Sequence, residues 1–451
     1  MTSIMKFLCF LSLIASLLFS EELMIKPILF SHFSSNGSDW VYENEPITTF
    51  GAGVDITYNN ESISVEANYL QLGFLGSINN GLYEFSPIKS LPYLDRSKDA
   101  DGYWSEYIKA KFTYRKSKSL QFNFGIFDRH WGQGIRAIHI SKKAPSYPQF
   151  GFDWKIKNNL TFTFFHGFLH SGIADSSRAE LYENKIGQRS LNIARNISSH
   201  RIQWKPLRNL ELSVNETVIY ATRELDIHYL IPFAPYYPIE NYLGDTDNLQ
   251  MGFDLSYNIY NKHKLYIGFF MDELTPEWIF NSKNHNWFAW QIGYNKNDLI
   301  IEKSNMVIEY NWTDQRIYKH KYTINDYYSH GQPLGFWAGP HAEEILIYFS
   351  IPLENSSIEF DYSYIKRGLI SNQNIDSNYN DTYDERYSNG HQSRSLNAIR
   401  ISKNSSMKGL SYLIGFNQVY FKNTGFTIIN EGLNRRKISF EFGFNYNFLK
   451  G

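Results

Sequence analysis

The C-terminal part of the chain shows a strict alternation of apolar and polar residues. From Lys437 to Phe448 the sequence reads KISFEFGFNYNF, with a large apolar side chain at every second position. Successive side chains point to opposite faces of a β-strand, so one face of this segment suits hydrocarbon and the other suits water. Such a strand is typical of a barrel whose exterior contacts lipid and whose interior is wet.

The same alternation recurs along the chain and predicts further strands. Clear examples fall at residues 63–69, 120–126, 210–215, 251–259, 306–311 and 358–364. A tilted strand needs about 9–11 residues to cross a bilayer. One such segment would suit a soluble sheet. The recurrence favours a membrane β-barrel over the alternative, a large secreted β-sandwich or propeller.

Short and long connections alternate between these segments. Tight polar turns are predicted at 59–60, 116–118, 158–159, 206–209, 261–263, 353–356 and 404–407. Long irregular stretches are predicted at 72–103, 128–149, 169–197, 221–248, 314–342 and 367–392. Outer-membrane barrels have short periplasmic turns and long extracellular loops. We therefore expect an all-β fold, a transmembrane antiparallel β-barrel of about 18 strands (16–18), with both termini in the periplasm.

The N-terminus has the pattern of a secretion signal. An apolar run at residues 7–18 follows a lysine and precedes two glutamates. The run is too short for a membrane-spanning helix and lies where a signal peptide belongs. We expect residues 1–20 to be a signal peptide and residues 21–451 to form a single barrel domain. The only cysteine, Cys9, lies within the signal, so no disulfide is expected in the mature chain.

Composition agrees with a secreted barrel. Aromatic residues make up 17% of the chain, although its mean hydropathy is only −0.40. Aromatic girdles at both membrane interfaces account for this combination. Downstream of the signal we find no apolar stretch of about 18 residues, so a helical membrane protein is not expected. The net charge of −1 argues against a nucleic-acid partner.

Four stretches carry motifs in a defined order. Residues 124–150 hold a strand followed by Trp-Gly-x-Gly and Ala-Pro elements, and residues 186–220 hold an arginine-bearing strand and a strand pair around a Pro-x-x-Asn turn. Residues 231–257 form a loop that ends in Asp-Asn, and residues 320–350 a tyrosine-rich loop with Gly-x-Pro-Leu-Gly and Gly-Pro elements. In this order the motifs resemble the capsule assembly Wzi family of bacterial outer-membrane proteins.

The resemblance implies a function as well as a fold. It implies an eighteen-stranded outer-membrane barrel that helps to anchor capsular polysaccharide at the cell surface, with its long loops exposed there. It also implies a lectin-like role without enzymatic activity or a cofactor. The expected partners are therefore capsular polysaccharide or exopolysaccharide, together with outer-membrane lipid.

The long loops contain side chains that suit a glycan. Flat aromatic rings can cover the C–H faces of sugars, and bidentate polar groups can bind their hydroxyls and carboxylates. The polysaccharide-binding candidates are Arg129, His130, Trp131, Arg136, Tyr236, Tyr237, Tyr327, Tyr328, His330 and Trp337. The alternative role for each is to pack the loops over the barrel mouth or to join an aromatic girdle.

The predicted inner wall carries charges of both signs. Lys109, Lys111 and Glu309 are lumen candidates, and the two lysines form a short basic ladder with Arg115. A basic ladder that faces a constriction loop would suit a porin or substrate-specific channel, which is the main competing function. Mixed charges also suit a lumen blocked by a cross-linked plug. We expect a largely blocked lumen because the resemblance implies one.

Motifs of catalysis are not found. The sequence has neither a G-x-S-x-G element nor an HExxH element. His166 and His170 would share a strand face about 13 Å apart, too far to chelate one metal ion. Glu343 and Glu344 would point to opposite faces of a strand and could not act together on a glycosidic bond. We expect neither an enzyme nor a metal site.

Overall fold

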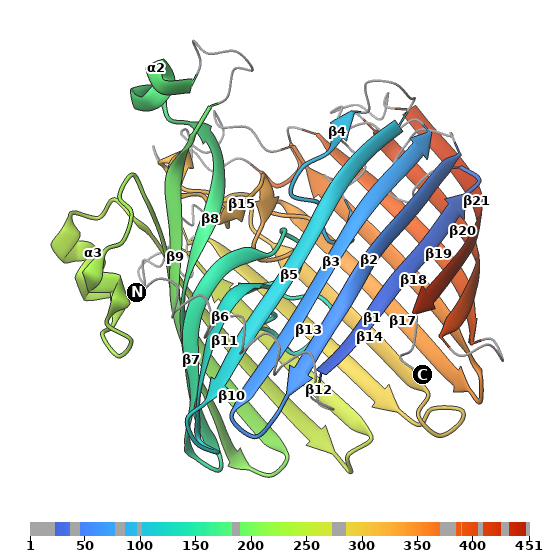
Figure 1. The fold of residues 1–451 in the computed structure, drawn as a ribbon, viewed down its shortest axis with the longest axis horizontal. Helices are drawn as coiled ribbons and strands as arrows, with labels where there is room; N and C mark the ends of the chain where they lie inside the picture. Colours follow the sequence, from blue (N-terminus) through green and yellow to red (C-terminus); the bar gives the residue numbers. More distant parts are fainter. Residues whose placement is uncertain are drawn as a thin grey trace, which may run out of the picture.

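Hydrogen bonds between the first and last strands close the sheet into a barrel (Figure 1). The computed structural model describes residues 23–36, 46–76, 86–96, 102–182, 190–272, 286–369, 385–388, 390–404, 409–424 and 433–447. In this part of the chain, eighteen long antiparallel strands form the wall, and β1 pairs with β21 from Ile28↔Asn447 to Ser34↔Glu441. Closure leaves no unpaired edge, which hydrocarbon would not tolerate. The predicted barrel is confirmed.

The wall strands follow one another around the barrel in chain order. They are β1 (Leu23–Ser34), β2 (Ile47–Asn59), β3 (Ile63–Gly76), β5 (Gly102–Arg115), β6 (Leu120–Phe127), β7 (Tyr147–Lys157), β8 (Leu160–Ala174), β9 (Asn192–Leu207), β10 (Leu210–Ala221), β11 (Asn248–Ile259), β12 (His263–Met271), β13 (Phe288–Asn297), β14 (Asn305–Thr313), β17 (Ala342–Leu353), β18 (Ser356–Gly368), β19 (His391–Asn404), β20 (Leu410–Thr424) and β21 (Leu433–Asn447).

Several short elements lie in the connections. They are β4 (Asp95–Arg96), β15 (Tyr328–Ser329), β16 (Gln332–Pro333), α2 (Ala179–Tyr182), α3 (Tyr236–Leu243) and the 3₁₀ helices η2 (Ser176–Arg178), η3 (Ile227–Leu230) and η5 (Thr323–Asn325). Within the ranges given above, no helix has the length and apolar character needed to cross a membrane.

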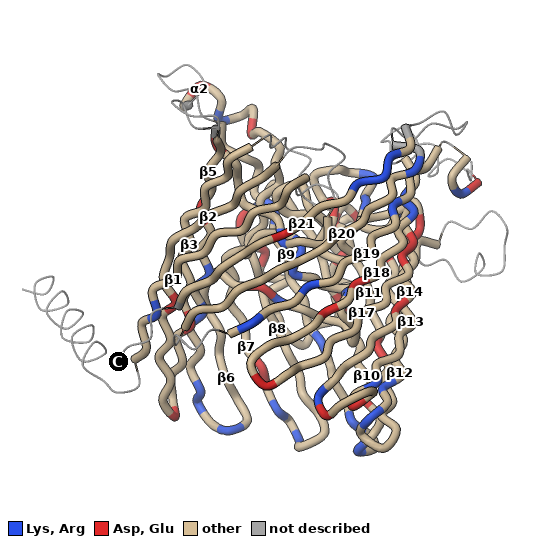
Figure 2. The backbone as a smooth tube through the Cα atoms, turned by 90° about the vertical axis from the view of Figure 1, so that its right-hand side faces the viewer, with Lys and Arg blue, Asp and Glu red and all other residues tan. Residues whose placement is uncertain are grey.

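The outward face of the wall is apolar, as the alternation predicts. On β21, Phe440 and Phe442 point outward and are 62% and 49% exposed, whereas Ser439 and Glu441 point inward and are 1% and 9% exposed. Other strands contribute similar outward side chains, including Ile108, Phe124, Ile267, Ile292, Ile401 and Ile414. Figure 2 shows that many of the charged residues gather at the turns and at the opposite rim. This apolar belt is the surface with which a barrel contacts lipid.

Short turns lie at one end of the barrel and long connections at the other. Among the described residues, the short turns are 60–62, 116–119, 158–159, 208–209, 260–262, 298–304 and 354–355. The sequence predicts all of them except 298–304, where exposed Ile300 and Ile301 prolong the apolar pattern. Most of the predicted turn at 404–407 lies outside the described residues. The predicted signal peptide, residues 1–20, lies outside the described residues.

One predicted long stretch, 169–197, is wrong in its extent. The strand β8 continues to Ala174 and β9 begins at Asn192, so both strands reach further than their patterns suggest. The pattern fails because Asn196 and Ser198 are polar yet point outward, where the loop after β10 covers them. The strands can therefore extend without exposing these polar groups to lipid.

The closed wall should make the protein resistant to detergent until it is heated. Every wall strand is paired along both edges, so unfolding must break many hydrogen bonds at once. We expect unboiled and boiled samples to migrate differently on a gel that contains dodecyl sulfate. Identical migration, or a protein that stays in solution without detergent, would contradict the barrel.

Candidate functional site

The connection between β6 and β7 folds into the barrel. We call residues 128–146 the inner loop. Its base is narrow because Trp131 and Ile140 form an isolated β-bridge, with the Trp131 N–H donating to the Ile140 carbonyl at 2.8 Å. Its tip includes Gly134, where an added Cβ would lie 2.2 Å from Oε1 of Glu309. Only glycine allows the backbone to approach the far wall this closely.

Two buried carboxylates on the far wall hold the inner loop. Glu309 on β14 is 0% exposed and accepts hydrogen bonds from the backbone N–H groups of Ile135 and Arg136. Glu344 on β17 is also 0% exposed and accepts from Nε and Nη2 of Arg136, each at 3.0 Å. Bidentate guanidinium–carboxylate pairs are strong and geometrically specific. Arg136 is therefore fixed on the wall opposite the strands from which its loop starts.

Further contacts tie the inner loop to β10, β11 and β12. A ring nitrogen of His139 lies 2.7 Å from the Asn215 side chain, and the other lies 3.3 Å from the Asp254 carboxylate. Gln133 donates its side-chain amide to Glu211 at 3.1 Å and accepts from Lys264 Nζ at 3.2 Å through its carbonyl. The inner loop thus crosses the lumen.

The connection between β14 and β17 lies on the inner loop. We call residues 314–341 the cover loop. The Tyr318 hydroxyl donates to the Ile138 carbonyl at 2.6 Å, and the Tyr327 hydroxyl donates to the His139 carbonyl at 3.1 Å. Trp337 donates Nε1–H to Glu344, the carboxylate that also holds Arg136. The two loops therefore form one layer across the barrel, with a shared apolar core that includes Trp131, Ile138, Tyr318, Tyr327 and Trp337.

Six of the ten predicted glycan-binding residues pack the loops in this structure. Trp131, Tyr236, Tyr327 and Trp337 are buried. The Arg129 guanidinium lies 4.3 Å above the Phe165 ring, and Arg136 is paired with Glu344. These contacts correspond to the alternative role, loop packing. Contact of these six with a glycan stays a prediction and would require the loops to open.

The other four candidates reach solvent. His130 is exposed, Tyr237 is 58% exposed, and Tyr328 and His330 are half-buried. His330 stacks on His170 of β8 with the ring centroids 4.4 Å apart. Tyr237 lies on the outside of the wall and not over the mouth, because the loop that carries it folds outward. The predicted site residues therefore do not form one continuous surface.

Sequence reasoning misses an accessible patch where two loops meet. We call residues 222–247, between β10 and β11, the side loop, and we call His228, Tyr242, Asp245, Lys321 and Tyr322 the junction patch. Lys321 of the cover loop pairs with Asp245 of the side loop at 3.4 Å. Tyr242 and Tyr322 are 80% and 49% exposed. The patch combines flat rings with both charge signs, but no local sequence signal shows that these two loops meet.

The predicted lumen residues point inward. Lys109 and Lys111 lie on β5 opposite Asn68 and Glu66 of β3, and Glu309 lies under the inner loop. The proposed ladder does not continue to Arg115, which donates to the Asn60 carbonyl in a short turn. Polar groups on the other side of the lumen, such as the Arg400–Asp361 pair (2.9 Å), are about one quarter exposed and keep access to water.

Groups considered for catalysis or metal binding lie apart. Glu344 points inward, whereas Glu343 points outward and accepts from the Tyr310 hydroxyl at 3.0 Å, so the predicted opposite directions are confirmed. His166 lies 2.8 Å from the Tyr220 hydroxyl, and His170 stacks on His330. In the residues described, no cluster of three His, Cys, Asp or Glu side chains could hold a metal ion.

Three histidines of the cover loop predict a pH dependence. The pKa values of His320, His330 and His341 are lowered to about 4, mainly by burial, and the nearby His170 contributes to the lowered pKa of His330. The ordinary value is 6.5, so the folded loop favours neutral imidazoles. This contribution to stability is complete above about pH 6.5 and is lost as the pH falls toward 4.

We expect the amide protons of residues 314–341 to exchange faster at pH 5 than at pH 7.5, after correction for the intrinsic rates. Hydrogen exchange followed by mass spectrometry measures this effect, with the turn at 158–159 as a reference segment that contains no histidine. A cover loop equally protected at both pH values would contradict the assignment of neutral histidines.

Comparison with solved structures supports the barrel fold. Wzi from Escherichia coli, an outer-membrane protein involved in group 1 capsule assembly and described as a carbohydrate-binding β-barrel, is 12% identical with a TM-score of 0.58. The match covers 98% of this chain and 88% of Wzi. The fold is that of outer-membrane barrels.

Two further solved structures are also similar. OprD from Pseudomonas aeruginosa is 11% identical with a TM-score of 0.47, and the match covers 95% of this chain and 94% of OprD. OccAB4 from Acinetobacter baumannii is 7% identical with a TM-score of 0.48, and the match covers 95% of this chain and 99% of OccAB4. At such identities the likeness extends to the fold alone. No protein-family model matches the sequence, and no curated protein matches it either.

Proposed function

We propose that this protein is a Wzi-like surface protein of the bacterial outer membrane. It binds exported capsular polysaccharide or exopolysaccharide and holds it at the cell surface during capsule assembly. It makes and breaks no covalent bond. The long connections face the exterior of the cell, and the short turns face the periplasm.

The observation that carries this proposal is the layer formed by the inner loop and the cover loop. A passive channel needs a continuous aqueous path, whereas here Arg136 spans the lumen to a buried carboxylate. Breaking such a pair leaves a charge without compensation at a cost of about 3–5 kcal/mol, so the layer does not open readily. A barrel that is filled in this way offers a surface for binding rather than a hole for transport.

The junction patch, where the cover loop meets the side loop, is the accessible surface best suited to a sugar polymer. Tyr242 and Tyr322 offer exposed rings for the apolar faces of sugar units, and Lys321 and Asp245 offer hydrogen bonds to hydroxyls. Each contact is weak. A long polymer can engage many such patches on neighbouring molecules, and the combined binding is strong although each contact stays reversible.

A substrate-specific channel is the second candidate. It is favoured by the water-accessible polar wall that includes Asp361 and Arg400, and by the inward-facing Lys109 and Lys111. Small solutes could pass beside the inner loop if this side of the lumen is continuous. Planar-bilayer conductance of the purified protein separates the two candidates, because a binding protein conducts no ions at rest.

Direct binding tests the proposal. Polysaccharide from the host strain is passed over purified protein that is immobilised at high density in detergent. We expect reversible binding that soluble polymer displaces and that free monosaccharides at the same sugar concentration do not, because only the polymer engages many patches at once. If the protein does not bind the polymer and conducts ions, the result would favour the channel.

A further inference from the structure

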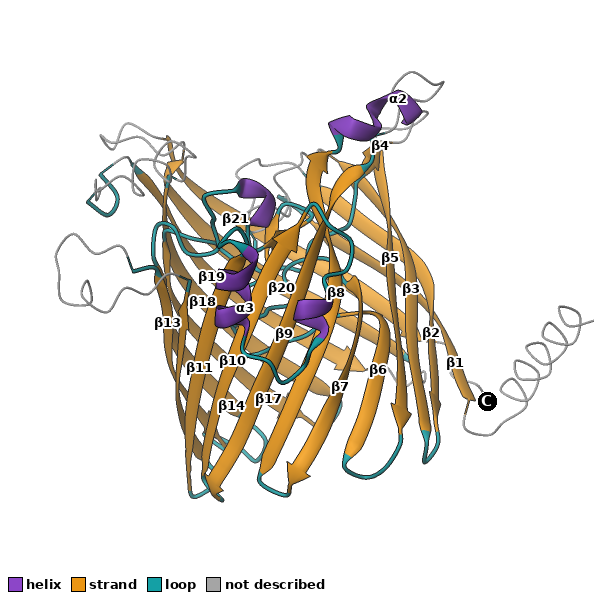
Figure 3. Cartoon of the chain, turned by 90° about the vertical axis from the view of Figure 1, so that its left-hand side faces the viewer, coloured by secondary structure: helices purple, strands orange, loops and turns teal. Residues whose placement is uncertain are grey.

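The side loop covers the outside of the barrel wall (Figure 3). Val218 and Tyr220 of β10 point outward yet are 0% exposed, because Tyr229 and Tyr236 of the side loop pack on them. Figure 1 likewise shows α3 outside β9. A stretch of wall that would otherwise contact lipid therefore contacts protein.

Polar side chains on the outward face fix the side loop in place. Ser198 on β9 donates to the Tyr229 carbonyl at 2.7 Å and lies 2.8 Å from the Tyr236 hydroxyl. Glu216 on β10 accepts from the Tyr236 N–H at 2.9 Å, where α3 begins, and pairs with His200 at 3.0 Å. Hydrocarbon would leave such groups without partners, so the loop and this part of the wall depend on each other.

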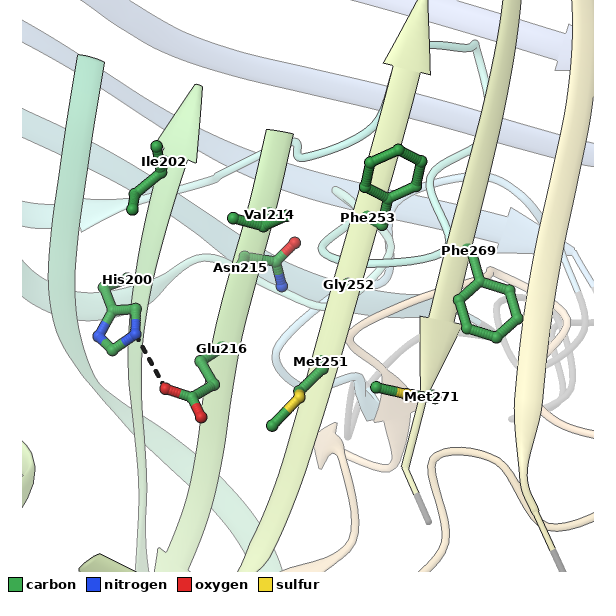
Figure 4. Close-up of a pocket in the computed structure, with 10 residues that line it drawn as sticks. All are labelled: His200, Ile202, Val214, Asn215, Glu216, Met251, Gly252, Phe253, Phe269 and Met271. Carbon is green, nitrogen blue, oxygen red and sulfur yellow. Dashed lines mark hydrogen bonds and ion pairs between the residues drawn. The ribbon is translucent and has the colours of Figure 1, made fainter. Parts of the chain in front are cut away.

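An open groove with a volume of about 320 Å³ begins beside α3 on the same outward face (Figure 4). Its lining is almost entirely apolar, and His200 and Glu216 lie at one end. The apolar lining residues are Ile202, Val214, Met251, Phe253, Phe269 and Met271. Met251 also packs against the apolar cluster beneath the side loop, so the groove starts where the protein cover stops.

The groove is continuous with the apolar belt. Val214 and Phe253 in its lining are 48% and 37% exposed, as are other outward residues of the belt. The side loop adds Phe233, which is 61% exposed and packs on Phe162 of β8 with the ring centroids 4.8 Å apart. The groove and Phe233 therefore face the same surroundings as the apolar belt.

We propose that this groove binds one acyl chain of a membrane lipid. The polar end of the groove is satisfied within the protein, because His200 bonds to Glu216 and its ring lies 4.5 Å from that of Tyr236. The apolar walls would then contact the hydrocarbon, and the ledge formed by α3 would hold the chain in one position. This site is independent of what the long loops bind.

The preference for the groove over the open belt is modest in size. Lipid tails are as apolar as the side chains that they contact, so no hydrophobic driving force separates the two positions. The bound chain gains van der Waals contacts with the walls of the groove that the flat belt does not offer. We expect an occupancy about three- to tenfold above that of the flat belt, which corresponds to roughly 0.7–1.4 kcal/mol.

Photolabelling tests the proposal. The full-length protein is reconstituted in phosphatidylethanolamine vesicles with a trace of the same lipid that carries a diazirine in one acyl chain. After irradiation, mass spectrometry compares adducts on the β11 segment 248–259 with adducts on the β13 segment 288–297. We expect a three- to tenfold excess on β11. The variant Val214→Trp fills the groove and should bring the β11 adducts down to the level of β13, whereas the matched belt variant Ile292→Trp should leave the excess unchanged.

Three outcomes would overturn the proposal. They are equal labelling of β11 and β13, an excess that Val214→Trp does not reduce, and crosslinks at this site to a second copy of the protein in place of lipid. The gel shift on boiling verifies that each variant is folded. If Val214→Trp does not fold, Val214→Phe fills less of the groove and carries the same expectation.

Discussion

Replacing Arg136 by alanine is expected to lower the free energy of unfolding by about 3–5 kcal/mol and to make the barrel conduct ions. The substitution leaves Glu344 buried and charged, with hydrogen bonds from Trp337 and Ser363 but without a compensating cation. The inner loop also loses its anchor on β17. Without that anchor, the tip of the inner loop can leave the lumen and open a path for water.

Two measurements follow this change. Denaturant unfolding in detergent gives the loss of stability, and planar-bilayer recording gives the conductance. Arg178→Ala is the matched control, since Arg178 forms an exposed pair with Asp175 that is worth at most about 1 kcal/mol. The double variant Arg136→Met, Glu344→Gln removes both charges and should recover part of the lost stability. If Arg136→Ala is as stable and as closed as the parent protein, the pair does not hold the layer.

Replacing Tyr322 by alanine is expected to weaken polysaccharide binding by about fivefold for a single patch, and replacing Lys321 as well should weaken it by more than tenfold. A lost aromatic contact costs about 1 kcal/mol, and the loss of Lys321 removes a charged hydrogen-bond donor. Because a polymer engages several molecules at once, the loss is larger on densely coated surfaces than on sparse ones. Binding of soluble polysaccharide to protein immobilised at two densities measures both effects.

The matched control for this experiment is Tyr260→Ala. Tyr260 is 91% exposed but lies in a short turn at the opposite end of the barrel. Its loss should leave binding unchanged. Equal binding by the Tyr322 variant and the parent protein would exclude the junction patch from the glycan site, and an equal loss in both variants would point to a general loss of folded protein.

The sequence predicts the wall of the barrel well, because the alternation is local. Each strand must place apolar groups outward and polar groups inward, so Phe440, Ser439 and their counterparts on other strands reveal the belt and the number of strands. The inward direction of Lys109, Lys111 and Glu309 follows from the same rule.

The arrangement of the loops cannot be predicted in this way. Arg136 and Glu344 are 208 residues apart in the sequence. The residues around each of them give no indication that the two side chains form a pair. The aromatic residues chosen as glycan contacts, such as Tyr327 and Trp337, are needed instead to fill the lumen. Aromatic rings serve both purposes equally well, so residue type alone does not separate an exposed ring from a packed one.

One usable signal was present in the sequence. Asn196, Ser198, His200 and Glu216 occupy outward positions of two neighbouring strands, where the belt should be apolar. Polar groups in hydrocarbon are costly, so a run of them indicates that protein covers the wall at that height. This signal points to the side loop and explains why Tyr236 and Tyr237 lie outside the barrel and not over its mouth.

Deletion of the gene tests the central claim, retention of polysaccharide by a closed barrel, most directly. Cell-bound and released polymer are measured in the parent strain, in the deletion strain and in strains complemented with the parent gene or with Tyr322→Ala, Lys321→Ala. We predict that the deletion strain sheds polymer into the medium while the total stays constant, and that only the parent gene restores retention. Polymer that stays on the cell while uptake of a small solute falls would contradict this account and favour a channel.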